Sequence, residues 1–235
     1  MRYSGPVEPE LIRELPTPEL ALALLKSLVA GSREINSNNL FRSAEAAYGQ
    51  ESDIAKLLDR LSDGWAWLEA RGLIGPNPRQ STGWSRITAD GMAMAEDGEA
   101  ITKLWAADRL AGHLDPALAG ARTIFNLGQY DTACFAAMKA VEIAVRDASG
   151  LGDHLTGTPL MQQAFKPDGG PLTDTTALQA ERVATMNLFA GAFGAFRNPA
   201  GHRAVHYEDP VEAAEVLQLA SLLLRIVRRA ERGMV

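Results

Sequence analysis

Cysteine, aromatic side chains and long apolar runs are all scarce in this chain of 235 residues. Because Cys134 is the only cysteine, the chain can form no internal disulfide and no cysteine-rich zinc site, and we expect Cys134 to be a small buried apolar residue. No stretch reaches the ~18–20 uninterrupted apolar residues of a membrane helix. The opening segment, MRYSGPVEPELIRELP, lacks the apolar core of a signal peptide. These absences favour a cytoplasmic protein.

An excess of positive charge is also missing. The net charge is -6, and neither half of the chain is basic: residues 1–110 hold 12 basic and 16 acidic groups, and residues 111–235 hold 11 and 13. Because phosphate contacts dominate nonspecific binding to nucleic acid, such binding is not expected to be strong. Any contact with nucleic acid must therefore come from local patches or from a small catalytic groove.

What the chain does contain is abundant alanine and leucine at helical spacing. With 46% hydrophobic and 22% charged residues, the composition is typical of a globular protein. We expect a mainly α fold in two modules, with residues 1–97 as the first, residues 98–112 as a linker and residues 113–235 as the second.

Three helices are expected in the first module. They cover residues 17–31, 39–48 and 52–71, and two short apolar segments, 73–74 and 84–87, follow around a turn-rich stretch. Thr88 can cap a final short helix. This order, together with the passage from WLEARGLI to RITADGMAMA, resembles a winged-helix domain with three helices and a small β-hairpin.

Three arginines, Arg71, Arg79 and Arg86, occur between residues 70 and 89 without an acidic residue, which indicates a modest basic wing for DNA. The helix over residues 52–71 is less favourable, because acidic groups interrupt its basic residues and are repelled by phosphate. Two interpretations therefore stay open for this module. It binds DNA through the wing, or it serves as a protein-contact or spacer module.

The second module is predicted as a bundle of helices near residues 115–128, 129–150, 177–196 and 210–229, with a long loop over residues 150–175. In the helix over residues 129–150 an apolar stripe faces the core. A separate polar face of that helix, at i, i+3 and i+7, is formed by Lys139, Glu142 and Arg146.

The segment RNPAGH lies between the last two predicted helices. Pro199 disfavours an α conformation at Asn198, which makes Asn198 a good N-cap. Arg197 and His202 are then separated by a tight turn, and both side chains can reach one pocket. A histidine and an arginine together can supply an acid/base group and a phosphate clamp.

The spacing from Arg197 to His202 matches the R-x(4–6)-H signature of HEPN proteins. The blocks GQYDTACFAAMKAVEIAVRDASG, LMQQAF, LFAGAFGAFRNPAGHR and DPVEAAEVLQLASLLLRIV together resemble the Ymh-type family of bacterial proteins over residues 113–232. Gly201 departs from the pattern, because alanine more often precedes the histidine in that family. Glycine removes no functional group but can loosen the turn.

The resemblance implies a C-terminal HEPN-type helical bundle. Active HEPN domains are metal-independent endoribonucleases that work as homodimers, with two RxxxxH segments forming one composite site. The resemblance further implies that His202 is the acid/base group, that Arg197 clamps the phosphate, and that Asn198 orients the substrate or caps the turn. No cofactor is expected, the substrate would be RNA, and the biological setting would be a bacterial toxin or antiphage system.

A noncatalytic reading stays open, because many HEPN domains bind a partner instead. In it Arg197 pairs with Glu142 or caps a helix, and the protein is a DNA-linked regulator or assembly module. For Lys139, Glu142 and Arg146 we favour a polar face with a salt bridge that braces the motif. His202 and His206 have a metal-chelating spacing, but no third ligand is obvious and no metal site is predicted. Small residues next to the motif offer a close dimer surface: Ala190, Gly191, Gly194 and Ala195.

Overall fold

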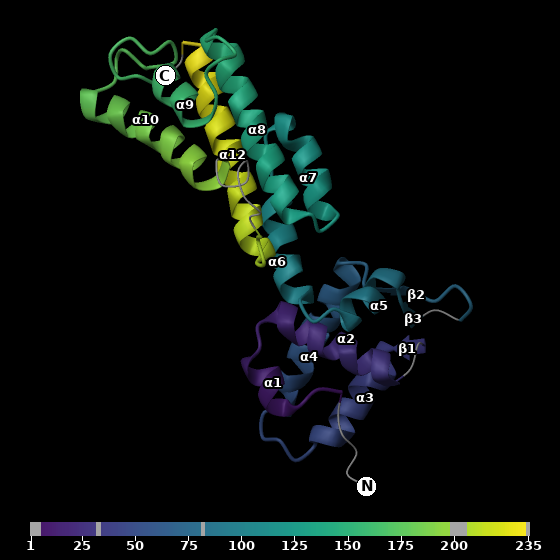
Figure 1. Cartoon of the computed structure of the whole chain (residues 1–235). Helices are drawn as coiled ribbons and strands as arrows, with labels where there is room; N and C mark the ends of the chain where they lie inside the picture. The colour runs from purple at the N-terminus through teal and green to yellow at the C-terminus, as the bar shows by residue number, and fades with distance from the viewer. Residues whose placement is uncertain (1–5, 32–33, 81–82, 198–205, 234–235) are drawn as a thin grey trace. The chain divides into compact units, whose positions relative to one another are not determined.

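The computed structural model of the chain describes residues 6–31, 34–80, 83–197 and 206–233. The chain divides into two compact units, an N-terminal unit of Met1–Ile101 and a C-terminal unit of Thr102–Val235. Figure 1 shows helices and a small sheet in the N-terminal unit and helices in the C-terminal unit. The segment expected as a linker, residues 98–112, contains helix α6 (Ala100–Leu110).

Helices and a three-stranded antiparallel sheet make up the N-terminal unit. Its elements are α1 (Pro9–Glu14), α2 (Thr17–Gly31), β1 (Glu34–Asn36), α3 (Ser37–Tyr48), α4 (Ile54–Ala70), β2 (Ile74–Pro76), β3 (Trp84–Ile87) and α5 (Ala89–Glu96). The strand order is β1-β3-β2, with Ile35 opposite Ser85 and Ile74 opposite Ile87. The expected helices and hairpin are therefore present, and α1 and β1 are additions that the sequence pattern did not predict.

Local signals explain where these elements begin. The Asn36 side chain accepts a hydrogen bond from the Asn39 N–H and caps α3, which starts two residues before the predicted position. Thr88 caps α5 as expected, because its Oγ1 accepts from the Gly91 N–H at 3.0 Å. β1 was missed because three residues are too few to show an alternating pattern.

Among its described residues, the regular elements of the C-terminal unit are all helical. It contains the 3-10 turn η1 (Pro116–Leu118), α7 (Ala119–Asn126), α8 (Tyr130–Ser149), α9 (Gly157–Ala164), α10 (Gln179–Ala192), the π-helical turn η2 (Phe193–Arg197) and α12 (Pro210–Glu231). Helices α8 and α12 lie side by side (Figure 1), and the apolar stripe of α8 belongs to the same core as the buried residues of α12. Gly150, at φ 65°, ends α8 where the sequence placed its end.

The expectation of an irregular loop over residues 150–175 was wrong in part. Helix α9 lies within it, because Leu160, Met161 and Ala164 recur at helical spacing and are fully buried in the core. The glycines, prolines and threonines around this short apolar group obscured it. α9 matters for the site because it packs between α10 and α8.

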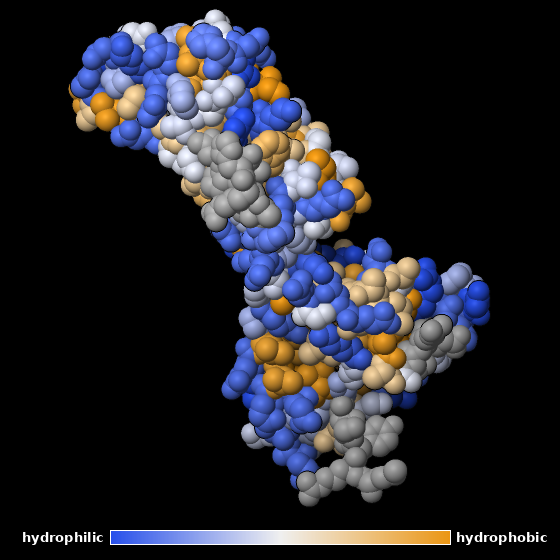
Figure 2. All heavy atoms as spheres, viewed as in Figure 1, coloured by the Kyte–Doolittle hydropathy of each residue, from blue (hydrophilic) through white to orange (hydrophobic). Residues whose placement is uncertain are grey.

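Each unit has its own apolar core. Cys134 is 1% exposed within the core of the C-terminal unit, as predicted, and burial raises the pKa of its thiol to about 12. On the face shown in Figure 2, hydrophilic residues cover most of the C-terminal unit and apolar residues are dispersed among them. None of the described helices combines the length and apolar character needed to cross a membrane.

Candidate active site around Arg197 and Glu142

The motif arginine ends the turn that follows α10. Nε of Arg197 lies 3.0 Å from Oε2 of Glu142 on α8, and the Glu142 side chain is only 8% exposed. The N–H of Nε is not directed at this oxygen, because Nε makes no hydrogen bond among the described residues. The contact is therefore an ion pair. It is the pairing that the noncatalytic interpretation expected for Arg197.

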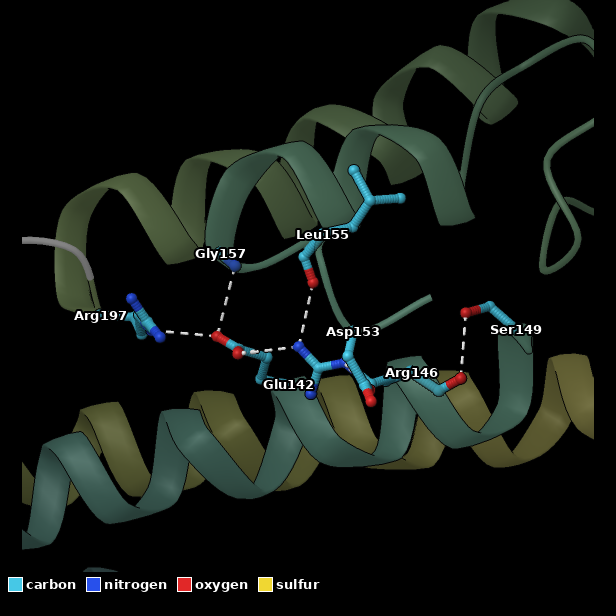
Figure 3. A network of polar contacts seen from close by, with 7 residues as sticks. All are labelled: Glu142, Arg146, Ser149, Asp153, Leu155, Gly157 and Arg197. Carbon is cyan, nitrogen blue, oxygen red and sulfur yellow. Dashed lines mark hydrogen bonds and ion pairs between the residues drawn. The ribbon is translucent and has the colours of Figure 1, made fainter. Parts of the chain in front are cut away.

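Glu142 is the centre of a polar network (Figure 3). Its Oε1 accepts a hydrogen bond from Nη2 of Arg146 at 3.2 Å. Its Oε2 accepts the backbone N–H of Gly157 at 3.3 Å. Gly157 is the first residue of α9, so the carboxylate also satisfies one of the N–H groups that a helix start leaves unpaired.

Arg146 links this carboxylate to the chain that leads into α9. Its Nη2 donates to the Leu155 carbonyl at 3.0 Å, and its Nε lies 3.7 Å from Oδ1 of Asp153. The Asp153 side chain is fully exposed, so solvent screens this second pair. Glu142 therefore forms ion pairs with both Arg146 and the motif residue Arg197.

Charge is unbalanced at this network. Two half-buried guanidinium groups, with 22% and 19% of their side chains exposed, share the one buried carboxylate of Glu142. The carboxylate compensates one positive charge, and exposed Asp153 contributes little to the other. Nε is the atom of Arg197 that lies within ion-pair distance of Glu142, and the terminal Nη groups have no partner among the described residues. The site can therefore accept an anion.

The path of the chain explains how Arg197 reaches α8. Phe193 is fully buried at the start of η2 and anchors the π-helical turn against α8 and α9. One turn earlier, Phe189 stacks on Phe165 with ring centroids 4.0 Å apart. Single π-helical turns are frequent at functional sites, because the extra residue redirects the side chains that follow.

The other residues predicted for the site are not part of the network that the structure describes. Lys139 is exposed on α8 and makes no ion pair among the described residues, so the structure does not bring it into the network. Asn198 and His202 lie outside the described residues. The predicted helix break before α12 is present, with the Asp209 side chain accepting the Val211 N–H at 2.8 Å.

The three wing arginines lie in different surroundings. Arg71 places its guanidinium 5.0 Å from the ring centre of Trp67. Arg79 and Arg86 line a hollow of about 620 Å³ beside the β2–β3 turn, and neither guanidinium has a partner among the described residues. Buried Asn77 lies at the same hollow and accepts the Arg79 backbone N–H.

Helix α4 offers less to nucleic acid than its sequence suggested. The guanidinium of Arg60 donates to the carbonyl oxygens of Ile12 and Leu15, at the end of α1. Arg60 therefore holds α1 in place instead of facing a ligand. Asp59 and Asp63 remain on the helix, and the balance of α4 is acidic.

Sequence reasoning missed a further pair in the C-terminal unit. Asp131, in the first turn of α8, accepts the Tyr207 N–H through Oδ1 at 2.7 Å and lies 3.1 Å from Nδ1 of His206 through Oδ2. The two segments are 76 residues apart in the chain, so no local motif joins them. In the described ranges, no group of three or more histidine, cysteine or acidic residues is arranged to hold a metal ion.

Comparison with known proteins supports an assignment for the C-terminal part alone. Residues 113–227 match the profile of a family described as "Protein of unknown function (Hypoth_ymh)". The comparison with curated proteins found no match, and neither did the comparison with solved structures. The match spans η1 to α12, and with them Glu142, Arg146 and Arg197. Residues 113–227 of this chain therefore form a Ymh-type domain.

Proposed function

We propose that the C-terminal unit is an HEPN-type domain that cleaves RNA without a metal ion. The observation that carries the proposal is the orientation of Arg197. Buried Glu142 forms an ion pair with its Nε at 3.0 Å, while its terminal Nη groups have no partner among the described residues. A guanidinium held in this way is preorganised to bind two oxygens of a phosphate.

The chemistry needs few groups, because RNA carries its own nucleophile. His202 takes the proton from a ribose 2′-OH, and the 2′ oxygen attacks the adjacent phosphorus. The bond from phosphorus to the 5′ oxygen breaks, and that oxygen takes a proton from a second acid. The products are a 2′,3′-cyclic phosphate and a 5′-OH. Arg197 stabilises the charge that develops on the phosphate oxygens.

A second copy of the chain completes the site in this proposal. It supplies the second histidine, so that acid and base come from different protomers. The outer surface of α10 and η2 suits close approach, since Gly191, Gly194 and Ala195 are exposed. A Cβ built on Gly191 or Gly194 meets nothing within 4 Å among the described residues. The excess positive charge beside Glu142 agrees with a phosphate ligand.

The test is incubation of the purified full chain with structured and unstructured RNA in EDTA. The expected result is cleavage with 2′,3′-cyclic phosphate ends. Arg197→Ala should lower the single-turnover rate by about 10²–10³-fold, as the loss of one donor to a developing oxyanion does. His202→Ala should abolish cleavage.

Arg182 provides a matched control. Its side chain is 23% exposed, close to the 22% of Arg197, and it too belongs to α10 and its extension. It donates to the Pro167 carbonyl and has no place in the proposed reaction. Arg182→Ala should therefore cleave at the wild-type rate. Equal rates for the wild type and Arg197→Ala would refute the proposed role of Arg197.

A second candidate function rests on the N-terminal unit. Its element order, from α2 through β1, α3 and α4 to the β2–β3 hairpin, agrees with a winged helix, and Arg79 and Arg86 line an open hollow. The alternative is a noncatalytic HEPN dimer that binds DNA through this wing. Sequence-specific retention of DNA that Arg79→Ala and Arg86→Ala abolish, with no cleavage of any RNA, would favour it.

A further inference from the structure

A hollow of the C-terminal unit lies where α8 begins. Its volume is about 540 Å³, and residues 128–132 and 206–208 line it. Asp131 joins the two segments, since its carboxylate accepts the Tyr207 N–H and contacts the His206 imidazole. One side chain thus sets the position of the ring that faces the hollow.

The His206 ring contacts Asp131 on one side and is exposed to solvent on the other. Its Nδ1 lies 3.1 Å from Asp131, while 76% of the side chain is exposed and Nε2 has no partner among the described residues. Beside it, Tyr207 is half-buried, and burial, with nearby Cys134, Glu212 and Asp131, raises the pKa of its phenol to about 12. The phenol therefore stays neutral and able to donate or accept a hydrogen bond.

The charges at this hollow select against phosphate. Asp131 and Glu208 line it, and no lysine or arginine does so among the described residues. A flat neutral group that donates hydrogen bonds fits better, because a carboxylate accepts from an amine and an aromatic ring stacks on its face. The exocyclic amines of adenine, cytosine and guanine meet this description, and uracil has no such amine.

Geometry relates the hollow to the arginine network. Asp131 and Glu142 project from nearly the same face of α8, about three turns and roughly 16 Å apart. A few nucleotides of single-stranded RNA span such a distance. Met138 lies on the same face of α8 between them and is fully buried. The RNA would therefore pass over the elements that cover Met138. In the sequence, residues 198–205 join the two places.

We infer that the Asp131–His206–Tyr207 hollow binds an unpaired, amine-bearing nucleobase of an RNA whose phosphate backbone lies at Arg197. The inference rests on the proposed function and adds a base preference to it. His206 stacks on the base, the carboxylates of Asp131 and Glu208 accept from its exocyclic amine, and Asp131 positions His206. The Asp131–His206–Tyr207 hollow thus discriminates between RNA sequences, whereas Arg197 binds a phosphate in any RNA sequence.

The test measures binding without cleavage. Short single-stranded 2′-O-methyl oligonucleotides lack the nucleophile, and fluorescence anisotropy with the full chain in EDTA gives their Kd values. Oligo-A and oligo-C should bind more tightly than oligo-U. His206→Ala should weaken the binding of oligo-A by roughly tenfold, within the range for loss of one stacking ring, and leave oligo-U nearly unchanged. Asp131→Asn should reduce the same preference.

His113→Ala is the matched control, because His113 is an exposed histidine of the same unit outside this hollow, and it should bind like the wild type. Removing the exposed His206 ring should not unfold the protein, which the Tm of each variant checks. Equal binding of oligo-A and oligo-U by the wild type, or an unchanged preference in His206→Ala, would overturn the inference. RNA cleavage that persists in that case leaves the proposed function standing, whereas binding of no oligonucleotide counts against both.

Discussion

Glu142 stands between Arg197 and Arg146, and its one carboxylate also holds the first N–H group of α9. Loss of the carboxylate charge therefore affects three elements at once, whereas loss of Arg197 leaves Glu142 paired with Arg146. Changes at Glu142 should therefore mainly lower the stability of the domain, whereas changes at Arg197 should mainly lower the activity that we propose for it.

Glu142→Gln should destabilise the C-terminal unit by about 2–3 kcal/mol. A fully buried pair costs roughly 3–5 kcal/mol to break, and the two arginines here are partly exposed, which reduces the penalty. Arg197→Ala should cost less than half as much. Urea unfolding of both variants measures the difference. A larger loss in Arg197→Ala than in Glu142→Gln would show that Glu142 is not the centre of the network.

Gly191→Leu should weaken self-association of the protein. A Cβ at this exposed position meets nothing within 4 Å among the described residues, so the fold should keep its stability within about 1 kcal/mol. The helix propensity of leucine, higher than that of glycine, favours the helix. A second protomer packed on this surface would be displaced. Light scattering and urea unfolding of the same samples check both points. Gly120→Leu, also open and outside this surface, is the control; an unchanged dimer in Gly191→Leu would exclude this surface.

Gly91→Ala should destabilise the N-terminal unit by about 2–3 kcal/mol. A Cβ at this position overlaps the Leu73 carbonyl oxygen and presses on Ile87, and α5 would have to move away from the sheet. Gly98→Ala, where a Cβ meets nothing within 4 Å, should have little effect. Thermal unfolding of the pair measures the contrast. Equal Tm values for the two variants would contradict the packing of α5 described above.

Acid should weaken the N-terminal unit through Asp53. Hydrogen bonds from Arg13 lower the pKa of the Asp53 carboxyl below its ordinary value. A lowered pKa in the folded state adds stability above the unfolded pKa, and this stability is lost as the pH falls through the folded pKa. The urea midpoint of the wild type should fall over this acidic range. Asp53→Asn should show a shallower fall, and identical slopes in both proteins would argue against the pairing.

Much of the fold could be predicted from the sequence, because it depends on local signals. The Cys134–Met138–Val141–Val145 stripe, the Thr88 cap and the end of α8 at Gly150 all act within a few residues. Helix α9 and strand β1 could not be found this way, because they are short and depend on packing against distant elements.

The site was predictable only where a polar side chain had a chemical reason to be buried. Glu142 and Arg146, four residues apart on the polar face of α8, indicated a salt bridge, and Arg197 is the motif cation that contacts the same carboxylate. The contact of Asp131 with His206 gave no such signal in the sequence, since the two residues are 75 positions apart and only the fold brings them together. The predicted role of Lys139 had no packing reason behind it.

The most direct test of the central claim changes the RNA and keeps the protein intact. Once a cleaved RNA is found, one 2′-deoxy nucleotide is placed immediately 5′ of the cut phosphate. If Arg197 binds a phosphate that the neighbouring 2′-OH attacks, cleavage at that phosphate should fall below detection in EDTA, while other sites in the same RNA are cut as before. Cleavage at the substituted position at an unchanged rate would contradict the account, because the nucleophile would then have to be water.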